Sequence, residues 1–196
     1  MNRFVLTLVL SQLLSGFSLS VQAATQSSPP EIFRGRNMPY EVLDSLPVST
    51  LKVGSGVIDV FFAPGQIDLP KSKLLNWVST SAEAVATYYG HFPVRHLFVL
   101  IVPIDGIGVR SGAAYGNQGA AIKVSIGRLT NEVDLNNDWE MTHEMVHLAF
   151  PDVSKEHHWI EEGIATYVEP IARAQAGKLD AEKVWEIGRA SCRERV

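Results

Sequence analysis

The chain has 196 residues, of which 46% are hydrophobic and 19% are charged, and its formal net charge at pH 7 is −4. This length and composition are typical of one globular domain with short flanking pieces. The acidic balance argues against a nucleic-acid-binding protein, because such proteins carry clustered positive charge.

The N-terminus has the pattern of a secretory signal peptide. Arg3 supplies the positive charge, residues 4–17 are mostly apolar, and residues 21–23 form a small-x-small cleavage site. The apolar run is shorter than the roughly 20 residues of a spanning helix, so we expect cleavage after about Ala23 and no stable membrane anchor. The pattern predicts a bacterial periplasmic or secreted protein, with a polar linker over residues 24–35.

The last ten residues, 187–196, match the translation of a common short-read sequencing adapter. We therefore expect this adapter-like tail to be foreign to the natural protein and the gene to be truncated near residue 186. Cys192, the only cysteine, lies in the tail. Residues 36–186 are expected to form one domain that lacks its C-terminal part and has neither disulfides nor thiolate ligands.

Three elements are predicted in the first half of the chain. Residues 57–62 are rich in β-branched and aromatic side chains, which predicts a strand. Residues 68–89 predict a helix, with Pro70 in its first turn and Gly90 after its end. The continuous apolar run 97–102 is typical of a central strand buried on both faces.

Residues 106–149 are predicted to form a loop, a strand and a helix. Glycine-rich residues 106–119 predict a turn and a loose loop, because no phosphate-binding strand and helix flank them. Residues 120–126 predict another strand. A helix is then expected from about 138 to 149, with Asn136 or Asn137 as its N-cap.

This helix contains the motif His-Glu-x-x-His at residues 143–147. Histidines four residues apart share one helical face, with Cβ atoms about 5–6 Å apart, so His143 and His147 can reach one metal ion. Glu144 lies off that face and can act as the general base beside a metal-activated water. The motif therefore predicts a zinc hydrolase site.

Catalytic zinc usually has three protein ligands and one open position, so one ligand is still needed. Metzincins supply a glycine and a histidine where this chain has Phe150 and Val153. We therefore expect a carboxylate from the next helix, within residues 157–169.

Four side chains compete for this third position. Glu161 and Glu162 lie about 100° apart on a helix, so only one of them can face the histidines. His157 and His158 are rival ligands in the loop or first turn before them.

The motif together with Trp-x-x-Glu-Gly-x-Ala-x-Tyr at 159–167 resembles the gluzincin zinc metallopeptidases, especially their aminopeptidase-N-like and glycyl-aminopeptidase-like branch. The resemblance covers roughly residues 136–170. It implies that Glu162 is the third ligand of one zinc ion per chain. It also implies that Glu169 is a carboxylate that orients a histidine ligand.

The resemblance further implies an edge strand that binds substrate through main-chain hydrogen bonds. Sequence order puts residues 112–126 in this role. The expected contact residues are Ala120, Ala121, Ile122, Lys123 and Val124. The aminopeptidase branch has Gly-Ala-Met-Glu-Asn here, whereas residues 112–116 are Gly-Ala-Ala-Tyr-Gly. The glutamate that grips a free amine is missing, so exopeptidase specificity is not implied.

These features predict an α+β fold, in which a small mixed sheet with an edge strand over the cleft is followed by zinc-binding helices, as in an incomplete thermolysin-like domain. The expected function is hydrolysis of a peptide or protein substrate, with Glu144 as the general base. A further oxyanion donor is expected downstream of the chain. Two alternatives stay open: a zinc hydrolase of non-peptide amides, and a catalytically silent binding protein on the same fold.

Overall fold

The computed structural model describes residues 29–151 and 153–193. The expected signal peptide and the last three residues of the adapter-like tail lie outside the described residues. No helix in the described part of the chain is long and apolar enough to cross a membrane.

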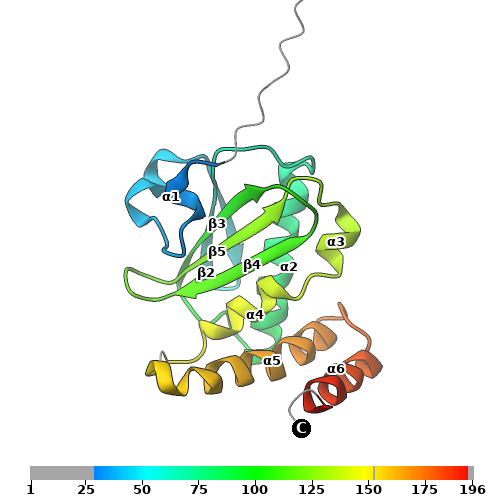
Figure 1. Ribbon diagram of the computed structural model, residues 1–196. Helices are drawn as coiled ribbons and strands as arrows, with labels where there is room; N and C mark the ends of the chain where they lie inside the picture. Colours follow the sequence, from blue (N-terminus) through cyan, green and yellow to red (C-terminus); the bar gives the residue numbers. More distant parts are fainter. Residues whose placement is uncertain (1–28, 152, 194–196) are drawn as a thin grey trace, which may run out of the picture.

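The described residues form a five-stranded mixed sheet with helices packed against it (Figure 1). In chain order the elements are α1 (Glu31–Arg34), η1 (Tyr40–Ser45), β1 (Val48–Val53), β2 (Gly56–Phe62), α2 (Lys71–Tyr89), β3 (His96–Ile104), β4 (Val109–Tyr115), β5 (Ala121–Gly127), α3 (Glu132–Asn136), α4 (Glu140–His147), η2 (Lys155–His157), α5 (His158–Gln175) and α6 (Ala181–Arg193). The mixed sheet followed by helices agrees with the expected α+β class.

The strand order is β1-β2-β3-β5-β4. β2, β3 and β5 run parallel to one another, whereas β1 pairs antiparallel with β2 and β4 pairs antiparallel with β5 at the two edges. The central position of β3 is confirmed, because its apolar side chains are buried on both faces of the sheet. α2 begins after Pro70 and ends at Gly90, whose φ of 77° lies in the left-handed region that favours glycine.

Two hydrophobic cores cover the two faces of the sheet. On one face, α2, α4 and α5 pack against strand residues such as Val60 and Val99. On the other face, residues 29–46 pack against Leu100 and Val102. The end of the predicted linker, residues 29–35, therefore belongs to the fold, since α1 buries Phe33 in this second core.

The predicted edge strand requires a correction. β5, which contains the expected contact residues Ala121, Ile122, Lys123 and Val124, lies between β3 and β4, and Ala120 directly precedes it. The edge strand is β4, which forms where the glycine-rich sequence predicted a loose loop. Small residues such as Gly112 and Ala113 carry no strand pattern, and only pairing with β5 reveals them as a strand.

The side chain of Lys123 also lies away from any cleft beside β4. It is buried under the N-terminal segment, where it donates hydrogen bonds to the carbonyl oxygens of Gly35 and Asn37. Burial lowers the pKa of this amine. Lys123 therefore anchors residues 29–46 to the sheet.

One expectation for the helices also changes. Asp138 accepts hydrogen bonds from the N–H groups of Glu140 and Met141, both at 3.2 Å, so it caps α4 in place of Asn136 or Asn137. α5 runs through Pro170 to Gln175. α6 extends past residue 186 into the part of the chain that is expected to be adapter-derived.

Replacing Asp138 tests what holds α4 in place. The carboxylate also accepts a hydrogen bond from the indole N–H of Trp77 on α2, at 3.1 Å. Asp138→Ala removes three acceptor contacts, so we expect the free energy of unfolding to fall by about 1–3 kcal/mol. Urea unfolding measures this loss. Asp44→Ala, at an exposed position of η1, is the control, and an equal effect of both variants would contradict the capping role.

Candidate metal centre

The site is built on two neighbouring helices below the sheet (Figure 1). α4 buries Met141 and Met145 in the main core, and this orientation turns His143 and His147 towards α5. α5 packs back through the buried side chain of Ala165. Gly163, in contrast, faces open space, so it is not required for the close approach of the two helices.

Three of the predicted ligands converge in the structure. Nε2 of His143 lies 3.3 Å from Nε2 of His147 and 3.2 Å from Oε2 of Glu162. Nε2 of His147 lies 3.6 Å from Oε1 of the same carboxylate. One donor atom from each residue falls within 4.8 Å of the other two.

These separations fit a tetrahedral zinc ion. Ligand atoms about 2.0–2.2 Å from such an ion lie about 3.3–3.6 Å from one another. Burial and the neighbouring His143 lower the pKa of His147, which favours the neutral imidazole that a metal ligand must be. The donor set of two imidazoles and one carboxylate is one that zinc uses in catalytic sites.

The other candidates for the third ligand have different partners. Glu161 is buried, accepts a hydrogen bond from the N–H of Val153, and contacts Nδ1 of His158 at 3.2 Å. His157 is exposed and lies 3.9 Å from Glu156. His158 is adjacent to the cluster, because its Nε2 lies 3.1 Å from Oε1 of Glu162.

Glu144 lies under the edge strand, beside the three convergent donors. Burial, followed by the charges of Glu140 and Glu162, raises its pKa to about 8, while a hydrogen bond from the backbone of Ala114 opposes this rise. A bound cation would favour the carboxylate form, because opposite charge stabilises it.

Gly112 of β4 leaves the space that Glu144 occupies. A Cβ atom at this position would lie 2.6 Å from Cγ of Glu144 and 2.9 Å from its Oε1. The main-chain N–H of Gly112 also donates a hydrogen bond of 2.6 Å to Glu140. The sequence pattern did not single out Gly112 or Glu140, although the spacing of four between Glu140 and Glu144 places both acids on one helical face.

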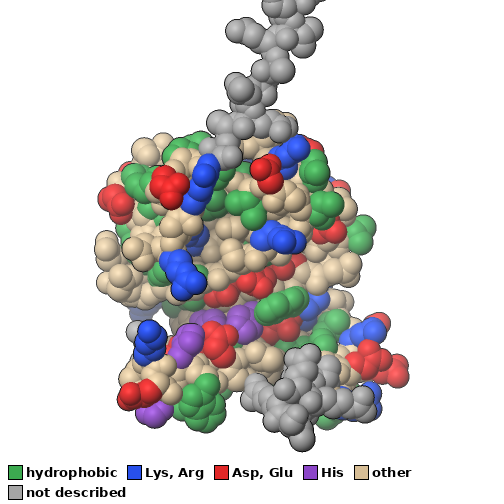
Figure 2. All heavy atoms as spheres, in the orientation of Figure 1, with side chains coloured by type: hydrophobic (Ala, Val, Ile, Leu, Met, Phe, Trp, Pro, Cys, Tyr) green, Lys and Arg blue, Asp and Glu red, His purple; other side chains and the backbone are tan. Residues whose placement is uncertain are grey.

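An open cleft of about 770 Å³ adjoins the cluster. One wall is β4 and the residues that follow it, from Gly112 to Asn117, and the other is formed by α4 and α5 with Glu144, His147 and Glu162. Figure 2 shows histidine and acidic side chains gathered where the sheet half of the molecule meets the helices below it. An extended chain lying along β4 would thus pass the cluster.

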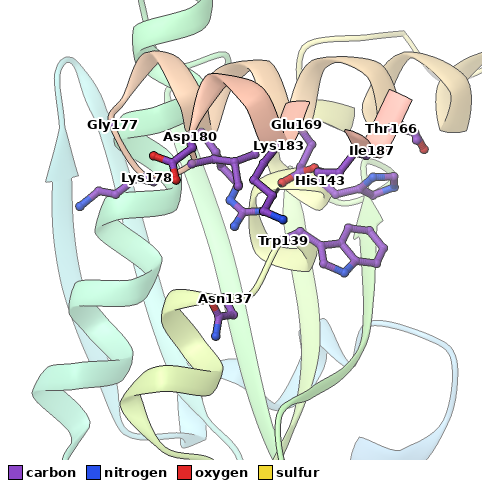
Figure 3. Close-up of a pocket in the computed structure, with 12 residues that line it drawn as sticks. Asn137, Trp139, His143, Thr166, Glu169, Gly177, Lys178, Asp180, Lys183 and Ile187 are labelled. Atoms are coloured by element: carbon purple, nitrogen blue, oxygen red, sulfur yellow. Dashed lines mark hydrogen bonds and ion pairs between the residues drawn. The ribbon is translucent and has the colours of Figure 1, made fainter. Parts of the chain in front are cut away.

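A second cavity of about 710 Å³ lies beyond His143 (Figure 3). Trp139 and Glu169 line it together with His143, and the rings of Trp139 and His143 meet edge to face at 5.3 Å. Glu169 accepts a hydrogen bond of 2.7 Å from Arg173. Burial raises the pKa of Glu169, and Arg173 opposes this rise.

The predicted contact of Glu169 with a histidine ligand is not among the hydrogen bonds of the described residues. Nδ1 of His143 is buried and has no hydrogen-bond partner among the described residues. Glu169 lines the same cavity, but its carboxylate is engaged by Arg173. A role for Glu169 in orienting a histidine therefore stays a prediction.

No protein-family model and no curated protein matches the chain. Among solved structures, an aminopeptidase N family protein from Idiomarina loihiensis has 12% identity and a TM-score of 0.46, with 71% of this chain and 27% of that chain covered.

An M1 zinc metallopeptidase from Deinococcus radiodurans has 20% identity and a TM-score of 0.37, with coverage of 66% and 28%. A mutant of an M1 zinc metallopeptidase from the same organism, bound to a Tyr-Ser-Ala substrate, has 16% identity and a TM-score of 0.40, with coverage of 67% and 29%. The chain thus spans less than a third of each of these solved chains. The evidence for function therefore comes from this chain's own residues.

Removing Glu162 or Glu161 tests the assignment of the third ligand. Glu162→Ala should weaken zinc binding by roughly 100-fold or more, because it removes a donor atom from the cluster. Glu161→Ala is the matched control and should change the affinity less than about tenfold. Competition with a chromophoric chelator measures both affinities. Equal affinity in Glu162→Ala and the parent would transfer the role to Glu161 or His158.

Replacing Gly112 tests the contact between β4 and Glu144. Gly112→Ala should lower the free energy of unfolding by about 1–3 kcal/mol, because the new methyl group overlaps Glu144. Gly116→Ala is the control, since a Cβ there meets nothing within 4 Å. In a Glu144→Ala background the Gly112 substitution should cost far less. The contact is refuted if chemical denaturation gives the same loss in both backgrounds.

Proposed function

We propose that the chain is a zinc-dependent peptidase that holds one zinc ion on His143, His147 and Glu162. The observation that carries the proposal is the convergence of these three donors at separations that fit a tetrahedral ion, with the Glu144 carboxylate beside them. A purely structural zinc site is usually closed by a fourth protein ligand, whereas the convergent group among the described residues consists of His143, His147 and Glu162.

The metal, Glu144 and β4 each have a separate role in the proposed hydrolysis. When bound, zinc supplies Lewis acidity, which lowers the pKa of a coordinated water towards about 7 and polarises a peptide carbonyl. Glu144 lines the same cleft as the ligands His147 and Glu162, so its carboxylate can accept a proton from the attacking water and return it to the leaving amine. β4 offers an extended backbone along which a peptide can align.

The signal-peptide pattern over residues 1–23 supports export to the periplasm or secretion. The proposed substrate is a peptide or protein. An exported chain would begin near Ala24. N-terminal sequencing of protein recovered outside the cytoplasm determines whether cleavage occurs there.

The substitution Glu144→Gln tests the catalytic part of the proposal. The variant keeps the shape of the side chain but cannot accept the proton, so zinc content should be unchanged while kcat/KM falls by about 100- to 10,000-fold. Hydrolysis of a quenched fluorescent peptide library by the zinc-loaded chain supplies the measurement. Glu83→Gln, on the exposed face of α2, is the control.

Two outcomes would contradict this proposal in different ways. Full activity of Glu144→Gln would exclude the general-base role. A zinc-loaded parent that cleaves no peptide would favour a hydrolase of other amides or a binding protein.

A further inference from the structure

The edge strand β4 has few side chains with which to hold its position. Residues 112–114 are Gly-Ala-Ala, and the pairing with β5 shifts register between Val109 and Ser111. Among the described residues no strand pairs with the outer side of β4. An outer edge of this kind leaves backbone N–H groups without strand partners.

Two of these N–H groups meet carboxylates of α4. Gly112 donates to Oε1 of Glu140 at 2.6 Å, and the backbone of Ala114 faces Glu144 and lowers the pKa of its carboxyl. Residues two apart on a strand point the same way and lie about 6.8 Å apart, while residues four apart on a helix lie about 6 Å apart along the axis. The strand and helix spacings therefore match, so that the two acids face alternate residues of β4, Gly112 and Ala114.

The two acids differ in their exposure to the cleft. Glu144 lines the cleft, whereas Glu140 is absent from its lining. Glu140 can thus keep its hydrogen bond to Gly112 while Glu144 exchanges its partner during a reaction. A hydrogen bond to a charged acceptor is also roughly twice as strong as one between neutral groups.

We propose that Glu140 is a positioning residue for the proposed hydrolysis, on which this inference rests. Its carboxylate fixes Gly112, and the bare Cα of Gly112 seats Glu144. Glu140 thereby holds the wall of the cleft and the general base in one arrangement. It contacts neither the convergent donors nor the cleft, so it acts only through Gly112 and Glu144.

The test compares Glu140→Ala with Glu140→Gln in the full chain loaded with zinc. Glutamine keeps a carbonyl oxygen that can accept from Gly112, whereas alanine removes the acceptor. Four quantities are measured for each variant: the hydrogen-exchange rate of the Gly112 amide, the zinc content, and kcat and KM for a cleaved peptide. Glu83→Ala is the surface control.

In Glu140→Ala the Gly112 amide should exchange at least about tenfold faster, because its hydrogen bond to a charged acceptor is lost. Zinc content should stay at one per chain. kcat should fall about tenfold or more, with KM within about threefold, because the general base loses its position while the ligands remain. Glu140→Gln should restore Gly112 protection and kcat to within about threefold of the parent.

Two results would overturn the proposal. One is unchanged exchange of Gly112 in Glu140→Ala, which would show that the contact does not hold the strand. The other is a Glu140→Gln variant as impaired as Glu140→Ala, which would assign the effect to the negative charge in the first turn of α4. Absence of hydrolytic activity in the parent would contradict the proposed function. The Gly112 exchange rate would still show whether the contact with Glu140 holds the strand.

Discussion

Imidazole nitrogens and carboxylates lie close together where α4 meets α5. The arrangement of the site depends on how the repulsion among these groups is offset. Two imidazole nitrogens lie 3.3 Å apart with the Glu162 carboxylate in contact, and the charges of Glu140 and Glu162 both act on the buried Glu144. Two like charges at 4 Å repel by about 4 kcal/mol at an effective dielectric constant of about 20. A divalent cation bound by the three donors would turn much of this repulsion into attraction.

Contacts on three sides hold this electrostatically unfavourable cluster in place. Asp138 fixes the start of α4 and ties it to α2 through Trp77. α5 brings Glu162 to the histidines, while its neighbour Glu161 is bound to the preceding loop. β4 closes the third side and gives backbone N–H groups to Glu140 and Glu144. The ligands thus come from rigid elements, and the open side is the cleft along β4.

The metal-binding pattern and the central strand could be predicted from sequence because both follow local spacing. The fixed spacing within residues 143–147 defines one helical face, and the apolar run in β3 identifies a buried strand. β4 could not be predicted in this way, because Gly112, Ala113 and Ala114 show neither alternation nor β-branched side chains. Its place at the edge, and the interior place of β5, depend on pairing between strands distant in sequence.

Contacts made by residues other than the proposed metal ligands also could not be predicted from sequence patterns. Asp138, rather than a neighbouring asparagine, caps α4, because its carboxylate reaches two backbone N–H groups and an indole at once. The partner of Glu169 is Arg173, one helical turn further on. These hydrogen-bond partners depend on which residues lie close together in three dimensions.

X-ray absorption spectroscopy of the purified, zinc-loaded chain, with elemental analysis of the same sample, tests the central claim most directly. The account predicts one zinc ion per chain, with two imidazole nitrogens near about 2.0–2.1 Å and oxygen ligands near about 2.0–2.2 Å. Absence of stoichiometric zinc, or a coordination shell with three imidazoles, would contradict it.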